Sequence, residues 1–145
     1  MPSDVSSLTS KDYDRKGADY YQLGDYEQAV DYFSEAIRLN PQYGDAYNNR
    51  GIAYRNLGQY ERAIQDYDEA IRLNPQYADA YINRGVAYYN LGQYERAIQD
   101  FDEAIRLNPQ FAEAYYNRGL AYDYLGKRVE SERDIQKAKE LGFPQ

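Results

Sequence analysis

Several kinds of residue that carry chemistry are missing from this chain of 145 residues. It contains no cysteine, no histidine and no tryptophan, and a single methionine. Without cysteine there are no disulfides and no thiol nucleophiles, and without histidine there is no imidazole base. The two residue types that most often bind transition metals are also absent. We therefore expect no catalysis, no metal and no cofactor.

Long apolar runs are also absent. No stretch approaches the roughly 18 apolar residues that a membrane-spanning helix needs. The first seven residues, MPSDVSS, lack the basic and apolar segments of a secretory signal. The net charge of −7 disfavours nucleic acid or an anionic membrane as a partner, although a basic partner would be compatible with it. These features predict a soluble, cytoplasmic protein.

Carboxylates occur in pairs that could be mistaken for catalytic acids. Asp66 and Asp68 are two residues apart, and so are Asp100 and Asp102. Side chains at this spacing diverge on a helix. The pairs recur once per repeat of the sequence, so we interpret them as a solvated face. No glycine loop of the phosphate-binding kind is present, and we expect no enzyme.

The chain is dominated by an internal repeat. Residues 44–77 and 78–111 align without a gap and are identical at 28 of 34 positions. The same period continues outward to residues 10–43 and 112–145. A constant period of this length is typical of stacked helical hairpins. We predict four repeats, preceded by a polar and disordered lead at residues 1–9.

Each repeat has the pattern of two helices. Small and aromatic residues recur with helical spacing, as at Tyr47, Gly51 and Tyr54. Gly58 follows this run and is a helix stop, and Pro75 ends the second run because proline lacks an N–H. One such hairpin cannot bury its apolar faces alone, so neighbouring hairpins must stack.

This pattern resembles the tetratricopeptide repeat, with tyrosine where that family often has tryptophan. The resemblance implies an all-α, right-handed superhelical solenoid of helical hairpins. In the second repeat the matching residues are Tyr47, Gly51, Tyr54, Leu57, Gly58, Tyr60, Ala63, Tyr67, Ala70 and Pro75.

The two ends of the array differ from its middle. Alanines expected to face the preceding hairpin become Asp12 and Asp19 in the first repeat. In the last repeat the outer positions of the second helix hold Arg128, Glu132 and Lys139. Polar outer faces are what terminal repeats need. We therefore expect a finished array of four hairpins with a polar capping helix at the end.

Arginine stands at a position where the family usually has leucine, namely Arg50, Arg84 and Arg118. A long aliphatic stem can pack while the guanidinium reaches solvent or a carboxylate. We predict that these arginines lie against the preceding hairpin, near an acidic side chain, and favour this structural role over ligand contact.

The resemblance also implies an inner groove formed by the first helix of every hairpin. Residues of the first repeat make it charged at one end, and later repeats make it aromatic and aliphatic. The first repeat contributes Lys11, Asp14, Arg15, Ala18, Tyr21 and Gln22. From the other repeats, the candidate peptide-binding residues are Asn49, Ile52, Arg55, Ile82, Asn83, Val86, Tyr89, Tyr116, Asn117 and Leu120.

Asparagine occupies one groove position in three successive repeats, at Asn49, Asn83 and Asn117. A carboxamide donates and accepts hydrogen bonds, so it can pair with an extended peptide main chain. Similar asparagine ladders hold peptide backbone in the O-linked N-acetylglucosamine transferases. The alternative is that asparagine is simply common at this position across the family.

Binding of acidic heat-shock protein tails is disfavoured. Family members with that activity use a clamp of Lys, Asn, Asn, Lys and Arg. Here one of the five positions matches, since they hold Asp14, Ala18, Asn49, Asp79 and Asn83.

Two functions remain open from the sequence. The first is an adaptor or scaffold that binds a protein or an extended peptide in the groove. The second is a structural or engineered consensus-like repeat protein without a dedicated ligand. We expect a monomer or weak self-association through the array ends.

Overall fold

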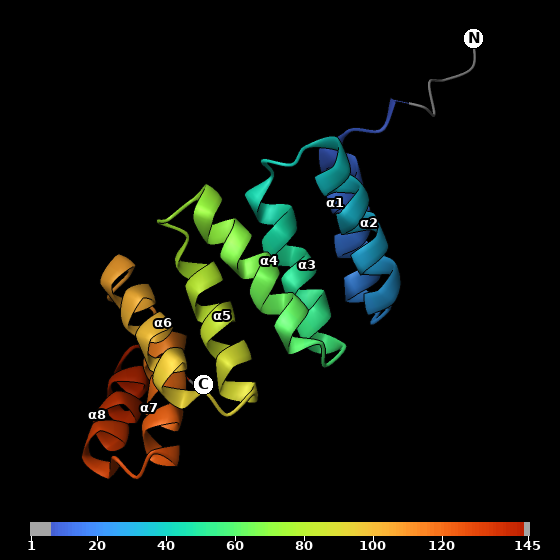
Figure 1. The fold of residues 1–145 in the computed structure, drawn as a ribbon. Coiled ribbons are helices and arrows are strands. Elements are labelled where there is room, and N and C mark those ends of the chain that lie inside the picture. The colour runs from blue at the N-terminus through green and yellow to red at the C-terminus, as the bar shows by residue number, and fades with distance from the viewer. Residues whose placement is uncertain (1–6, 144–145) are drawn as a thin grey trace. The chain divides into compact units, whose positions relative to one another are not determined.

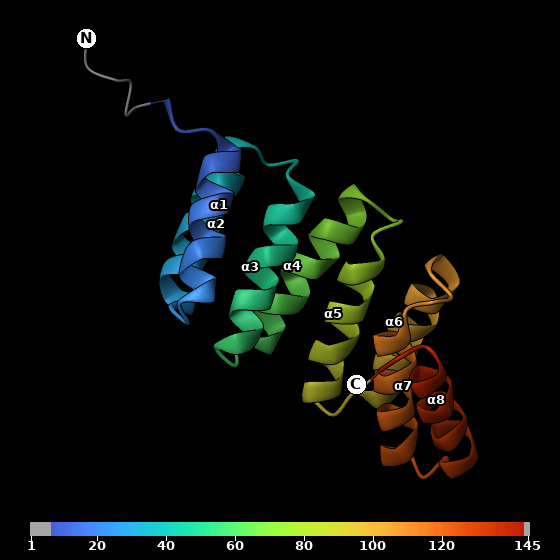
Figure 2. The same ribbon diagram turned by 180° about the vertical axis from the view of Figure 1, so that it is seen from behind.

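The computed structural model describes residues 7–143, and this part of the chain contains eight α-helices and no strand (Figures 1 and 2). The all-α fold and the helical hairpins are therefore confirmed. The helices are α1 (Ser10–Gln22), α2 (Tyr26–Leu39), α3 (Gly44–Asn56), α4 (Tyr60–Leu73), α5 (Ala78–Asn90), α6 (Tyr94–Leu107), α7 (Ala112–Tyr124) and α8 (Arg128–Glu140).

The helices fall into two compact units, residues 1–75 with α1–α4 and residues 76–145 with α5–α8. In the first unit α1 pairs with α2, α3 pairs with α4, and α2 packs on α3. The second unit repeats this order with α5–α8. The first helices also touch within each unit, α1 with α3 and α5 with α7. The right-handed superhelix stays a prediction.

A glycine with a positive φ ends the first helix of each hairpin. Gly58, for example, has a φ of 75°. The Gln59 N–H then donates back to the Tyr54 carbonyl oxygen at 2.9 Å, which closes the end of α3. Only glycine adopts this left-handed backbone without a steric penalty. The repeated Leu-Gly dipeptide therefore fixes the tight turn.

A second glycine lets the two helices of a hairpin approach closely. A Cβ atom on Gly17, Gly51 or Gly85 would lie 2.5–2.6 Å from an aromatic ring of the second helix. The rings belong to Phe33, Tyr67 and Phe101, which are almost fully buried. Each of the first three hairpins is thus closed by a ring that packs directly on backbone.

Alanines form the contact between successive hairpins. Ala53 of α3 clusters with Ala29 and Phe33 of α2. In the second unit Ala114 of α7 clusters with Ala104 of α6. The prediction that these alanines face the preceding hairpin is therefore confirmed within each unit.

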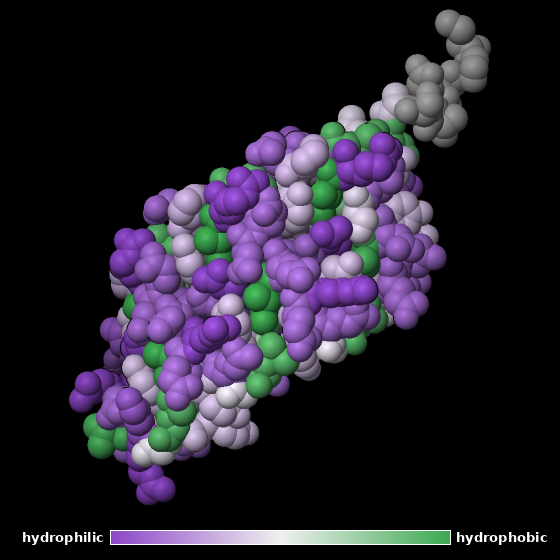
Figure 3. All heavy atoms as spheres, viewed as in Figure 1, coloured by the Kyte–Doolittle hydropathy of each residue, from purple (hydrophilic) through white to green (hydrophobic). Residues whose placement is uncertain are grey.

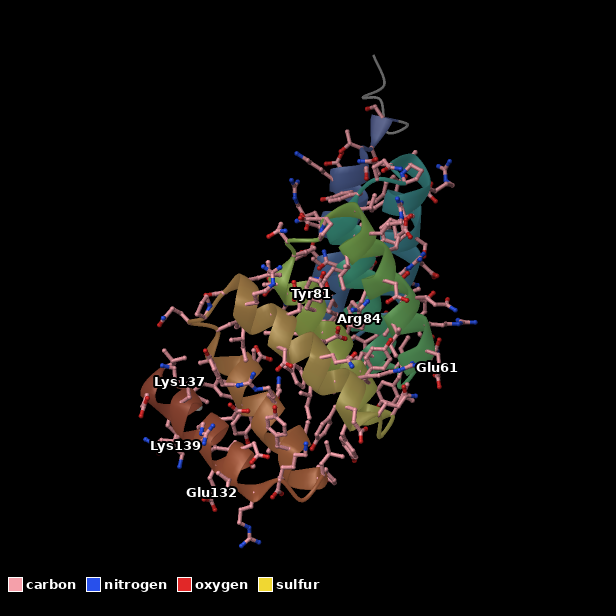
Figure 4. The ribbon with its side chains drawn as sticks, turned by 60° about the vertical axis from the view of Figure 1, so that its left-hand side comes forward. Glu61, Tyr81, Arg84, Glu132, Lys137 and Lys139 are labelled. Carbon is pink, nitrogen blue, oxygen red and sulfur yellow. The ribbon has the colours of Figure 1, made fainter. Side chains whose placement is uncertain are left out.

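The polar residues predicted for the ends lie on the surface. Asp19 of α1 is exposed, as are Glu132 and Lys139 of α8, whereas Ala138 of α8 is buried. Glu132 and Lys139 point away from the ribbon in Figure 4. On the face drawn in Figure 3, hydrophilic residues predominate and hydrophobic ones appear in narrow strips.

The contact between glycine and ring predicts a stability effect. Gly85→Ala places a methyl group 2.6 Å from the Phe101 ring. The ring must shift, and such overpacking costs about 1–3 kcal/mol. Urea unfolding should show this loss. Gly44→Ala is the control, because its nearest neighbour would be 3.8 Å away and its stability should not fall. Equal effects of the two substitutions would contradict this packing.

Tyr67 differs from Phe33 and Phe101 by a hydroxyl. That hydroxyl is buried and has no hydrogen-bond partner among the described residues, and burial raises the pKa of Tyr67. An unpaired buried polar group costs about 1–3 kcal/mol. Tyr67→Phe should therefore raise the thermal midpoint, and Tyr60→Phe, at a half-exposed position, should leave it unchanged. A lower midpoint for Tyr67→Phe would mean that the hydroxyl is satisfied.

Candidate functional site

The arginines at the unusual repeat position form buried ion pairs. Arg84 donates from Nε and Nη2 to the two carboxylate oxygens of Asp100, at 2.9 and 2.7 Å. Arg50 pairs in the same way with Asp66, and Arg118 with Asp134. In Figure 4, Arg84 lies beside Tyr81 on α5, and its guanidinium carbon is 5.6 Å from the centre of that ring.

These pairs correct one expectation. Asp66 and Asp100 are only 4–5% exposed, so they do not belong to a solvated face. The reason is that an arginine of the first helix points at each of them across the hairpin. The prediction that each arginine lies near an acidic side chain is confirmed, and its main carboxylate partner lies in its own hairpin.

Two of the arginines also donate a hydrogen bond to the preceding hairpin. Arg118 Nη1 donates to Asp102 of α6 at 2.9 Å, and Arg50 Nη1 donates to Ser34 of α2 at 3.1 Å. Hydrogen bonding to Asp134 raises the pKa of Arg118. Arg50 and Arg118 thus each join three helices, which supports the structural role.

The inner face of the first unit is hollowed between α1 and α3. The hollow has a volume of about 200 Å³. Three of its residues come from groove positions of the first repeat, which the sequence predicts to form the charged end of the groove. It is lined by Ala18, Tyr21, Gln22, Phe33, Asn49 and Ile52.

Ala18 explains why the hollow occurs here. The corresponding residues of the other repeats are Ile52, Val86 and Leu120. The smaller side chain of Ala18 leaves room above the Phe33 ring, which also lines the hollow. Sequence reasoning named Ala18 as a groove residue but left it out of the candidate site. Its small size at an aliphatic position was the available signal.

Part of the Asn49 amide is already hydrogen-bonded within the protein. Its Nδ2 donates to Asp14 Oδ1 at 3.0 Å, and the Tyr43 hydroxyl donates to Asp14 Oδ2 at 3.1 Å. Burial and the Asp14 charge raise the pKa of Tyr43 to about 12. Asn49 therefore also positions Asp14, and the three asparagines of the predicted column are not equivalent. Arg55 and Ile52 are half-buried on the same helix.

In the second unit, most of the candidate residues are partly exposed on α5 and α7. These are Asn83, Val86, Tyr89, Tyr116, Asn117 and Leu120. Ile82 is the exception. It is 2% exposed and clusters with Ala104 and Ala114, so it is a core residue and not a pocket residue. At its position in the helix the side chain faces the following hairpin.

Aromatic side chains gather at the C-terminal ends of α5 and α7. The Tyr89 ring lies edge-on to Tyr94 and Tyr124, with centroids 5.4 and 5.5 Å apart. Burial and the hydrogen bond with Tyr124 raise the pKa of Tyr89 to about 12. Tyr116 packs edge-on against Phe143 at 5.0 Å. Tyr89 and Tyr116 are thus partly covered by other rings of the same unit.

Residues 7–143 contain neither a cluster of metal-ligating side chains nor a helix that could cross a membrane. No three His, Cys, Asp or Glu side chains gather there as a metal site would need. Within the same residues, no helix combines the length and apolar character that crossing a membrane requires.

The chain belongs to the tetratricopeptide-repeat family. The family model described as tetratricopeptide repeat matches residues 15–78, 49–110 and 82–140. The helical hairpins and the repeat residues agree with this assignment, and nothing in the family or in the described residues points to catalysis.

Solved structures and one curated protein resemble the chain. It is 30% identical to MamA, with a TM-score of 0.86 over 91% of this chain and 77% of that one. It is 28% identical to the first repeat domain of Spaghetti (RPAP3) bound to the HSP90 peptide SRMEEVD, with a TM-score of 0.80 over 81% and 94% of the two chains. An uncharacterized protein of Methanocaldococcus jannaschii is 49% identical over 35 residues, which span 24% of this chain and 41% of that protein.

The buried ion pairs predict a large stability effect. Arg118→Ala leaves the carboxylate of Asp134 buried without its guanidinium, and breaking such a pair costs about 3–5 kcal/mol. The control is Arg106→Ala, whose exposed pair with Glu103 is worth at most about 1 kcal/mol. Urea unfolding of both variants is the measurement. A small loss for Arg118→Ala would show that the pair contributes little.

Proposed function

We propose that the chain is an adaptor or scaffold module that binds an extended peptide segment of a partner protein on the first helices of its hairpins. The observation that carries the proposal is the open hollow on α1 and α3, where apolar side chains meet the amides of Gln22 and Asn49. Apolar surface beside a few polar groups is typical of binding sites.

The second unit offers a related surface. Val86 and Leu120 are half-exposed on α5 and α7. The Asn117 side chain has no hydrogen bond to any described residue, so its amide is available to a peptide main chain. Tyr124 is 63% exposed beside Tyr89 and adds aromatic surface. Apolar side chains gathered on one face often mark an interaction site.

The similar structure of Spaghetti (RPAP3), which holds an HSP90 peptide, supports peptide binding as a class of function. This similarity does not imply that the present chain binds the same peptide. Asp14 and Asp79 stand where the acid-binding clamp has lysines, and they would repel a carboxylate. We therefore expect a different ligand.

A peptide library screened on the intact chain, followed by calorimetry, tests the proposal. Asn117→Ala should weaken the selected peptide several-fold, because a neutral hydrogen bond contributes about 0.5–1.5 kcal/mol. Tyr89→Ala should cost more, at least about 2 kcal/mol, as expected of an aromatic anchor. Circular dichroism should show an unchanged helix content.

Gln99→Ala is the matched control, since Gln99 is exposed on the second helix of the same hairpin as Tyr89. An equal loss for Gln99→Ala would move the site off the first helices. If no peptide is selected and sedimentation shows association that grows with concentration, the alternative of a stacking module without a ligand is the better account.

A further inference from the structure

The hollow on α1 and α3 and the carboxylate beside it define what the first unit would bind. We propose that the hollow takes one apolar side chain of the peptide, and that Asp14 takes a lysine or arginine side chain next to it. This inference rests on the proposed function and names the chemistry of the partner.

The size and the lining of the hollow fit one apolar side chain. Its volume of about 200 Å³ exceeds the ~150 Å³ of an apolar cavity that binds benzene. Phe33, Ala18 and Ile52 supply apolar surface, and Tyr21 adds an aromatic wall. A side chain the size of leucine or phenylalanine would bury its surface there and displace water.

The charge beside the hollow favours a cation. Asp14 is held by two neutral donors, the Tyr43 hydroxyl and the Asn49 amide. No basic side chain within residues 7–143 forms an ion pair with it, and the neighbouring Arg15 pairs with Asp12 at 3.9 Å. An incoming ammonium or guanidinium would add a charge-assisted hydrogen bond, which is stronger than a neutral one.

The two subsites are adjacent, because Asn49 lines the hollow and also contacts Asp14. Side chains two residues apart on an extended peptide point the same way and lie about 6.6–6.8 Å apart. The two positions on the peptide should therefore be separated by one residue. The resulting preference is the opposite of the acidic tail that a lysine clamp selects.

Fluorescence polarisation with synthetic peptides tests this inference on the full chain. The probes are labelled, amidated nonapeptides with Leu or Phe two residues from Lys, and matched peptides in which Lys becomes Glu or the apolar residue becomes Ser. The Lys peptides should bind at least about tenfold more tightly than the Glu peptides, as expected for loss of a charged contact.

Two variants separate the subsites. Ala18→Ile fills the hollow with the residue that the next repeat carries at this position, so the hairpin should still fold. It should abolish the preference for Leu or Phe over Ser. Asp14→Asn should abolish the preference for Lys over Glu while its oxygen still accepts hydrogen bonds. Asp31→Asn, at an exposed position on α2, is the control and should change neither preference.

The outcomes distinguish the inference from the proposed function. Equal binding of Lys and Glu peptides, or unchanged preferences in Ala18→Ile and Asp14→Asn, overturns the inference alone. The same holds if none of these probes binds but a library peptide does and is weakened by Asn117→Ala. If neither the probes nor any library peptide binds, the proposed function fails as well.

Discussion

The close contact between a glycine and a large side chain is the constraint on which each hairpin depends. Phe33, Tyr67 and Phe101 pack on glycines of the first helix, and in the last hairpin Ile135 takes the same place against Gly119. Because two helices can approach this closely only where a Cβ is missing, their spacing is set by this contact. The same spacing brings the arginine of the first helix within bonding distance of the aspartate of the second.

That spacing allows the buried ion pairs to form. These pairs distinguish the last three repeats from the first. Arg50, Arg84 and Arg118 each meet an aspartate 16 residues further along the chain. The first repeat lacks this pair and has Lys16 and Tyr32 instead. There the Tyr32 ring stacks on Tyr20 at 5.1 Å and replaces the ion pair. One position in the hairpin thus accepts either a charge pair or a stacked ring.

Periodicity and turn residues were enough to predict the hairpins, because a repeated pattern of small, aromatic and turn residues leaves few alternatives. The site was predicted less well. Ile82 was assigned to the groove by its position alone, although its neighbours Ala104 and Ala114 bury it. Asp66 was interpreted as solvated because the aspartate pair recurs in the repeats, whereas its partner Arg50 lies on the other helix of the hairpin. The hollow over Phe33 is lined by residues of three helices, so the sequence signals it only through the small size of Ala18.

The hydroxyl of Ser34 affects how the hairpins separate when the chain unfolds. It accepts the Arg50 bond between α2 and α3 as a neutral hydroxyl, whereas Asp102 provides a charged oxygen between α6 and α7. Both bonds are charge-assisted because the guanidinium is ionised, but only the bond to Asp102 joins two opposite charges. In a linear array the stability is a sum of hairpins and their interfaces. Opening of α1–α2 therefore breaks the hydrogen bonds to Ser34 and Asp14, whereas opening of α7–α8 breaks an ion pair with the exposed Asp102. Added salt screens the second link more than the first.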